Sequence, residues 1–146
     1  MLIRKDGSWI HEGKPIRRPS MVRLFASILK REGEEYYLVN PVEKVRIQVE
    51  DCPFVIVAME CTGISEQSVL RFTTNVGEIV ELNSDHRLNL GKQGDEQEPH
   101  PVIYLRDELS ALLNRNVFYE LSQYVVEYQD ALGIWSAGEF HSLQPL

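Results

Sequence analysis

Two segments of the chain carry apolar side chains at helical spacing. Residues 20–31 place theirs on one stripe, with Ser20 at the expected N-cap, and this pattern predicts a helix. Residues 117–128 repeat the pattern over a longer and more aromatic stretch, for which Asn116 is the expected cap. A short third helix is predicted at residues 107–113.

The rest of the chain shows the alternation and the short apolar runs that are typical of β-strands. Residues 8–11 and 15–18 flank a glycine turn and predict a hairpin, whereas residues 91–99 are polar and predict a solvated loop. The other strands that we expect are residues 36–39, 45–49, 54–59, 69–74, 78–82, 102–105 and 133–135. Their close succession favours an antiparallel meander.

A strand followed by a capped helix is expected at residues 16–29 and again at residues 103–113, about 87 positions later. Either chance or an internal duplication accounts for this similarity. The elements together predict an α+β fold of two small subdomains, each a mostly antiparallel sheet with a helix. We place them at residues 1–67 and 68–146.

The 146 residues carry a net charge of −7, which counts against a general nucleic-acid binder. Eight of the 15 Lys and Arg residues, but two of the 22 Asp and Glu residues, lie within residues 1–31, so a basic segment precedes an acidic body. The longest apolar run, residues 54–59, is too short to span a membrane. Cys52 and Cys61 stand outside any C-x-x-C spacing, and we expect free thiols in a reducing cytoplasm.

The sequence contains no recognisable catalytic or metal-binding motif. It lacks Gly-x-Ser-x-Gly and the glycine-rich phosphate loops, and its four histidines form no H-x-H or H-x-x-x-H pair. We therefore expect no catalytic residue, no metal and no cofactor, and we favour a non-catalytic protein.

One local constellation favours an anionic ligand. Arg17 and Arg18 directly precede the expected helix start at Ser20. A helix N-terminus carries a partial positive charge, and arginine adds planar donors that suit phosphate or carboxylate. The alternative is that both arginines pair with acidic residues of the second half, such as Asp107 or Glu108.

Residues of the second half are expected to close this site. Tyr119 lies off the apolar stripe of its helix and is the aromatic residue that we expect in a cleft, whereas Tyr124 and Tyr128 are expected in the core. The ligand-binding residues that we predict are Arg17, Arg18, Ser20, Glu43, Arg106, Arg115 and Tyr119.

Several phrases of the sequence are familiar as a set. They are residues 6–9, 15–18, 24–29, 37–44, 49–54, 114–121 and 136–140. With them the chain resembles the bacterial domain-of-unknown-function family 1285 over essentially its whole length. The phrases Asn-Pro-Val-Glu-Lys at residues 40–44 and Glu-Asp-Cys-Pro-Phe at residues 50–54 are the most specific. Asn40 and Cys52 depart from the family pattern, in which we expect Thr and Ala.

The resemblance implies two duplicated α+β subdomains, the second like a pleckstrin-homology domain, with a site for a nucleotide-like ligand at their interface. It also implies a role in signal transduction. We therefore expect a non-catalytic module that binds a small anionic ligand, and not a membrane. One alternative is a protein-interaction adaptor that uses a sheet edge or residues 91–99. Another is a hydrolase or transferase acting on a nucleotide, which needs carboxylates such as Glu43 and Asp51 near a metal.

Overall fold

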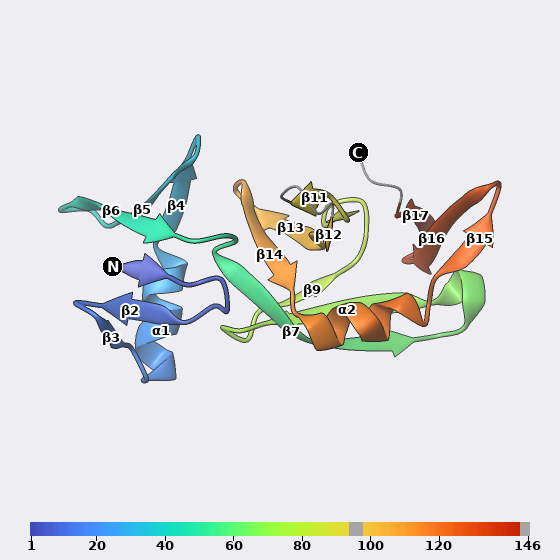
Figure 1. The fold of residues 1–146 in the computed structure, drawn as a ribbon, viewed down its shortest axis with the longest axis horizontal. Coiled ribbons are helices and arrows are strands. Elements are labelled where there is room, and N and C mark those ends of the chain that lie inside the picture. Colours follow the sequence, from blue (N-terminus) through green and yellow to red (C-terminus); the bar gives the residue numbers. More distant parts are fainter. Residues whose placement is uncertain (94–97, 144–146) are drawn as a thin grey trace.

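The computed structural model describes residues 1–93 and 98–143, and its main elements form three units in a row (Figure 1). A six-stranded sheet with one helix lies at one end, a second six-stranded sheet lies in the middle, and a three-stranded sheet lies at the other end. Neither of the two α-helices in this part of the chain has the length and apolar character needed to cross a membrane.

The first sheet joins two antiparallel three-stranded meanders. Its strands are β1 (Leu2–Ile3), β2 (Trp9–His11), β3 (Lys14–Pro15), β4 (Leu29–Glu32), β5 (Glu35–Val39) and β6 (Lys44–Val49). The spatial order is β3-β2-β1-β6-β5-β4, and β1 pairs with β6 in parallel. Helix α1 (Pro19–Ser27) connects the two meanders, and its Phe25 ring stacks on Trp9 with the ring centroids 6.1 Å apart.

The second sheet repeats this arrangement. Its strands are β7 (Phe54–Thr62), β8 (Val69–Thr74), β9 (Ile79–Glu81), β10 (Leu88–Asn89), β13 (Val102–Arg106) and β14 (Leu109–Leu113). The order is β10-β13-β14-β7-β8-β9, so the first strand again runs parallel to the last, with a meander on each side. The protein therefore has the predicted α+β fold with two similar halves, although the duplication lies in the strand order and not in the 87-position register.

The third unit follows helix α2 (Arg115–Ser122) and consists of β15 (Val126–Tyr128), β16 (Ala131–Ser136) and β17 (Glu139–Ser142). Ser136 holds it against the second sheet, because its buried hydroxyl donates to the Leu82 carbonyl (2.7 Å) and accepts from the Leu70 amide (3.0 Å). The unit is antiparallel throughout.

The predicted hairpin at residues 8–18 is confirmed, as are all seven further strands that we expected. Along the chain, β6 is the last strand of the first sheet and β7 is the first strand of the second. Residues 54–67, which we expected in the first subdomain, contain β7 and the 3-10 turn η1 (Ser65–Gln67). Within residues 91–99, two short strands pair, β11 (Lys92–Gln93) and β12 (Glu98–Pro99), and residues 94–97 of the expected loop lie outside the described residues.

The predicted ends of the first helix are wrong. The helix begins at Pro19 with Arg18 as its N-cap, so Ser20 lies inside the first turn and caps nothing. It ends at Ser27 with Ile28 as the C-cap, because β4 (Leu29–Glu32) pairs with β5. Residues 29–32 thus form a strand through cross-strand hydrogen bonds, although their composition also suits a last helical turn.

The helix that we predicted at residues 107–113 is also wrong. Asp107 and Glu108 have φ angles of 50° and 63° and form the tight turn of the hairpin that β13 and β14 make. Leu109, Ala111 and Leu113 are buried at alternate positions, which is the period of a strand. The strand–helix repeat that we aligned at residues 103–113 fails with it.

The cap and the end of the second helix need correction as well. Asn114, not Asn116, is the N-cap, and its side chain accepts from the Val117 amide at 2.8 Å. The helix ends at Ser122, and the residues that we expected in its last turn form β15. Tyr124 and Tyr128 are consequently exposed and not part of the core.

Candidate functional site

A cavity of about 330 Å³ lies where the first half meets the β8–β9 turn of the second half. The loop and strand at the start of the chain contribute Asp6 and Trp9, the segment that leads into α1 contributes Arg17, and α1 itself contributes Arg23. The second half contributes Asn75. The cavity is therefore built from both halves, as the interface site implied by the family resemblance would be.

Asn75 fixes the wall of this cavity. Its amide nitrogen donates to the Gly7 carbonyl at 3.0 Å, and its amide oxygen accepts from the Val55 backbone at 3.0 Å. Gly7 has a φ of +92°, and a Cβ atom there would lie 2.8 Å from the Asn75 nitrogen. A residue with a side chain at position 7 would thus push the two halves apart.

The charges in the cavity are of both signs. Arg17 and Arg23 are exposed, and neither has an ion-pair partner in residues 1–93 or 98–143. The Ser8 hydroxyl and amide donate to the Asp6 carboxylate at 2.6 and 2.9 Å and hold the pKa of Asp6 below its ordinary value. The cavity therefore offers two guanidinium groups and one ionised carboxylate at neutral pH.

Trp9 adds an unmet hydrogen-bond donor. Its side chain is 1% exposed, and the indole Nε1 is buried without an acceptor among the described residues. Buried polar groups in folded proteins almost always have a partner, so an orphaned donor beside a cavity indicates a place for an acceptor.

The structure brings only part of the predicted ligand-binding set to this cavity. Arg17 lines it, whereas Arg18 and Ser20 are exposed on the adjacent helix start and do not. The alternative pairing of Arg17 and Arg18 with Asp107 or Glu108 is not seen either, because the described residues hold no ion pair between these arginines and these carboxylates.

The other predicted residues lie elsewhere. Arg106 on β13 pairs with Glu78 at 3.1 Å. Arg115 and Tyr119 are exposed on α2. Glu43 lines a different, more apolar cavity of about 520 Å³ beside α1 and β5. None of these four residues lines the cavity between the halves.

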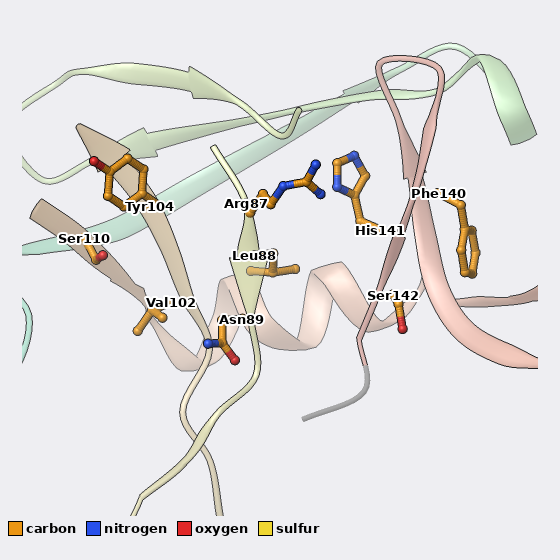
Figure 2. A pocket seen from close by; sticks show the side chains of 9 residues that line it. All are labelled: Arg87, Leu88, Asn89, Val102, Tyr104, Ser110, Phe140, His141 and Ser142. Atoms are coloured by element: carbon orange, nitrogen blue, oxygen red, sulfur yellow. The ribbon is translucent and has the colours of Figure 1, made fainter. Parts of the chain in front are cut away.

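A third cavity, of about 550 Å³, opens between the second and third sheets (Figure 2). Arg87 reaches toward His141 in it and stands 4.0 Å from Glu139. Burial lowers the pKa of His141, so this ring is neutral at pH 7, and its Nε2 contacts the Ser136 carbonyl at 3.1 Å. Arg87, the one cation among the residues that line this cavity, thus has the Glu139 carboxylate nearby. This cavity therefore suits an anion less well than the cavity lined by Arg17 and Arg23.

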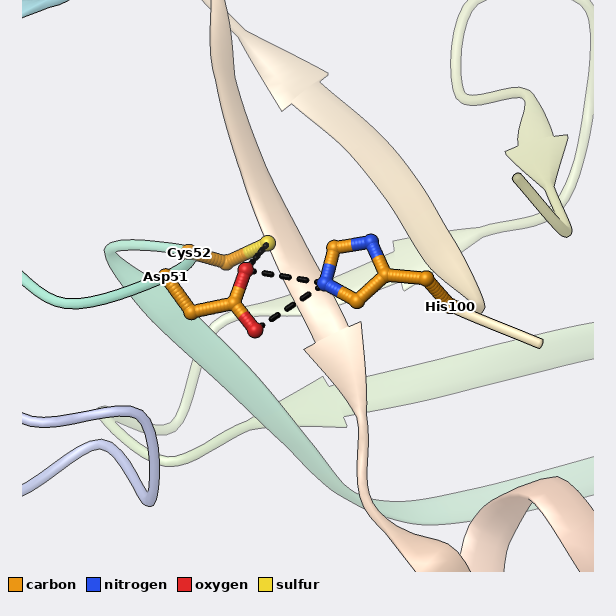
Figure 3. Close-up of side chains that lie close together, drawn as sticks. All are labelled: Asp51, Cys52 and His100. Atoms are coloured by element: carbon orange, nitrogen blue, oxygen red, sulfur yellow. Dashed lines mark hydrogen bonds and ion pairs between the residues drawn. The ribbon is translucent and has the colours of Figure 1, made fainter. Parts of the chain in front are cut away.

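A cluster of three reactive side chain types lies at the junction of the halves (Figure 3). His100 Nε2 contacts both carboxylate oxygens of Asp51, at 2.8 and 3.0 Å. The thiol of Cys52 lies 3.7 Å from the same carboxylate. Burial, reinforced by the charge of Asp51, raises the pKa of Cys52 to about 12. The thiol is therefore protonated at neutral pH, and the cluster does not resemble a cysteine nucleophile activated by histidine.

The two free thiols should differ in reactivity. At pH 8 only about one Cys52 side chain in ten thousand is a thiolate, whereas Cys61 is half-buried at the β7–β8 hairpin. We expect a disulfide reagent to modify Cys61 at least about tenfold faster than Cys52. Stopped-flow modification of the single-thiol variants Cys52→Ala and Cys61→Ala measures each rate, and similar rates would contradict the assignment.

Sequence patterns did not reveal most of these residues. Asp6, Arg23 and Asn75 reach the cavity from three separate segments, and Asn75 carries only a turn signal. His100 follows Asp51 by 49 positions without any metal-binding spacing. Only the pairing of the two halves brings these groups together.

Comparison with known proteins places the chain in a family. The N-terminal domain model of DUF1285, described as a domain of unknown function, matches residues 1–52, and the C-terminal domain model matches residues 53–143. The chain belongs to the DUF1285 family. The resemblance noted in the sequence is thus confirmed, whereas the likeness of the second half to a pleckstrin-homology domain stays a prediction.

Two solved structures of DUF1285 proteins are similar to this chain. One, from Silicibacter pomeroyi DSS-3, is 42% identical with a TM-score of 0.91, and the match covers 100% of this chain and 80% of that one. The other, from Shewanella baltica OS155, is 30% identical with a TM-score of 0.64 over 84% of this chain and 89% of that one. No curated protein matches the chain.

Proposed function

We propose that this DUF1285 protein is a non-catalytic module that binds a small anionic, nucleotide-like ligand between its two halves and acts in signal transduction. The observation that carries the proposal is the cavity lined by Arg17 and Arg23, two arginines without an ion-pair partner among the described residues, at the junction of the halves.

The chemistry of the cavity suits a ligand with both an anionic group and hydrogen-bond donors. Arg17 lies beside the positive end of α1 and Arg23 lies one turn inside the helix, and both offer bidentate donors to a phosphate. Asp6 can accept from a ribose hydroxyl or an amino group, which a bare phosphate ion lacks. The indole of Trp9 requires an acceptor. A volume of about 330 Å³ suits a ligand near the lower end of the drug-sized range, such as a mononucleotide.

The hydrolase or transferase alternative has less support. It needs carboxylates that converge on one metal or substrate. Glu43 lines the cavity beside β5, whereas Asp51 is engaged by His100 at the junction of the halves. These two carboxylates therefore belong to different places in the fold.

The adaptor alternative is favoured by one observation. Large apolar side chains are exposed in succession from α2 to β16, namely Tyr119, Tyr124, Val126, Tyr128 and Leu132. Exposed apolar patches on soluble domains often mark protein contacts. This surface is separate from the cavity between the halves.

A fluorescence titration tests the ligand-binding proposal. The variant Trp135→Phe leaves Trp9 as the one indole of the chain, so its emission reports on the cavity. We expect nucleotides or other phosphorylated metabolites to change this emission and to raise the melting temperature. The double variant Arg17→Ala/Arg23→Ala should weaken such a ligand by about a hundredfold or more, because it removes two charged hydrogen-bonding partners.

Arg115→Ala is the matched control, since Arg115 is also an exposed arginine with no ion-pair partner within residues 1–93 and 98–143, but lies on α2. It should leave the affinity unchanged. A ligand that is lost with Arg115→Ala and kept by the double variant would overturn this placement. Failure of every phosphorylated compound to bind, together with a partner protein that is released by Tyr128→Ser, would favour the adaptor.

A further inference from the structure

We propose that Asp51, Cys52 and His100 form a binding site for a divalent transition metal ion, of which zinc fits best. The ligand atoms of these three side chains all lie within 4.8 Å of one another (Figure 3). This site is distinct from the cavity between the halves, and it does not depend on the proposed function.

The donor set selects the class of metal. A carboxylate oxygen, a thiolate sulfur and an imidazole nitrogen together are typical of zinc, whereas calcium and magnesium take oxygen ligands. In a tetrahedral zinc site the ligand atoms stand about 3.3–3.6 Å apart. The observed separations of 2.8 Å from His100 to Asp51 and 3.7 Å from Cys52 to Asp51 bracket this range, and all three ligand atoms lie within 4.8 Å of one another, so small side-chain movements bring them to this geometry.

The site is sheltered and already held by the backbone. Cys52 is 8% exposed, and the side chains of Asp51 and His100 are 13% and 23% exposed. The backbone amide of His100 donates to the Gly91 carbonyl, which holds the backbone that carries the ring. Buried ligands on fixed backbone lose little conformational entropy when an ion binds.

Binding is balanced in charge and protons. The ion replaces the thiol proton of Cys52, which passes to solvent. The ring proton that Nε2 of His100 donates to Asp51 in the metal-free protein moves to Nδ1 by exchange with solvent, so that Nε2 offers its lone pair to the ion. The carboxylate of Asp51 and the new thiolate neutralise the two positive charges of the ion. Three protein ligands leave a fourth position for water or another donor, as in zinc sites that are open to solvent.

The position of the site gives the ion a structural consequence. Asp51 and Cys52 end the segment matched by the N-terminal family domain, and His100 lies in the segment matched by the C-terminal domain. A bound ion therefore ties the connection between the two sheets to the loop that precedes β13.

Equilibrium dialysis with Zn²⁺ and titration with Co²⁺ test the site directly. We expect one zinc ion per full-length chain, and Co²⁺ should give the near-ultraviolet charge-transfer band that reports a thiolate ligand. Cys52→Ala and His100→Gln should each weaken zinc binding by about a hundredfold or more, since even partners outside the ligand set are worth about 10–100-fold. Cys61→Ala and His11→Gln are the matched controls and should bind as the parent does.

Each result decides the question. Circular dichroism melts of all four variants show whether they are folded, and Asp51→Asn provides a third ligand variant that keeps the side chain volume. The proposal is overturned if the parent binds no stoichiometric zinc. It is also overturned if the cobalt complex lacks the thiolate band, or if the folded Cys52 and His100 variants keep the parent affinity.

Discussion

Replacing Ser136 by alanine should lower the free energy of unfolding by about 2–4 kcal/mol. The Ser136 side chain is fully buried and has two partners, the Leu82 carbonyl and the Leu70 amide. Alanine leaves both backbone groups buried without a partner, and each such group costs about 1–3 kcal/mol. The loss should be much larger than that of an ordinary serine because one hydroxyl satisfies two separate strand ends.

Urea denaturation followed by far-ultraviolet circular dichroism measures this loss. Ser84→Ala is the matched control, because Ser84 is exposed in the turn after β9, and it should change the stability by less than about 0.5 kcal/mol. Ser136 anchors the third sheet, which carries the ring cluster of Tyr128, Trp135 and Phe140. The near-ultraviolet signal of these rings should therefore weaken first. Equal stabilities of the two variants would show that the hydroxyl is not the anchor.

The strands were predictable from the sequence because their apolar residues alternate or run together. The hairpin turns were predictable only where glycine marks them. The turns Glu12-Gly13 and Ala137-Gly138 contain glycine, whereas Asp107-Glu108 and Gln129-Asp130 reach positive φ without it. Two-residue hairpins with positive φ at both positions strongly prefer asparagine or glycine. Segments that lack this signal were assigned to helices.

The helix predicted at residues 107–113 was wrong for a related reason. Leu109, Leu112 and Leu113 have the three- and four-residue spacings of a helix, whereas the strand buries Leu109, Ala111 and Leu113 on one face. Pairing with β13 and β7 decides in favour of the strand. The pairing with β7 joins residues 57 positions apart, such as Ala111 and Phe54, and leaves no local mark in the sequence.

The candidate site was predictable only in its local part. Arg17 and the start of α1 are neighbours in sequence, so their conjunction was visible. Arg106 and Arg115 were assigned to the site from their charge alone. In the fold, Arg106 pairs with Glu78 and Arg115 lies at the start of α2, away from the cavity between the halves. Asn75 has no charge and belongs to no motif, yet it forms a wall of the cavity between the halves. Its side chain accepts from the Val55 amide within the second half and donates to the Gly7 carbonyl across the interface.

Replacing Trp9 by alanine should lower the free energy of unfolding by about 3–5 kcal/mol. Trp9 is 1% exposed, belongs to the core of the first sheet and stacks on Phe25. Alanine removes most of this buried ring and leaves a void against α1. Chemical denaturation measures the loss, and a loss below about 1 kcal/mol would show that the site collapses around the smaller side chain.

Trp9→Phe separates the packing of the ring from its hydrogen-bond donor. Phenylalanine keeps an aromatic ring against Phe25, although a smaller one, and removes the N–H that has no acceptor among the described residues. We therefore expect it to cost less than half as much stability as Trp9→Ala. If the N–H instead serves a bound ligand, Trp9→Phe should weaken that ligand by about tenfold while it leaves the free protein nearly as stable. This outcome would assign the Trp9 N–H to ligand binding in the cavity between the halves. An equal loss of stability in Trp9→Ala and Trp9→Phe, with ligand affinity unchanged in Trp9→Phe, would assign Trp9 to the core alone.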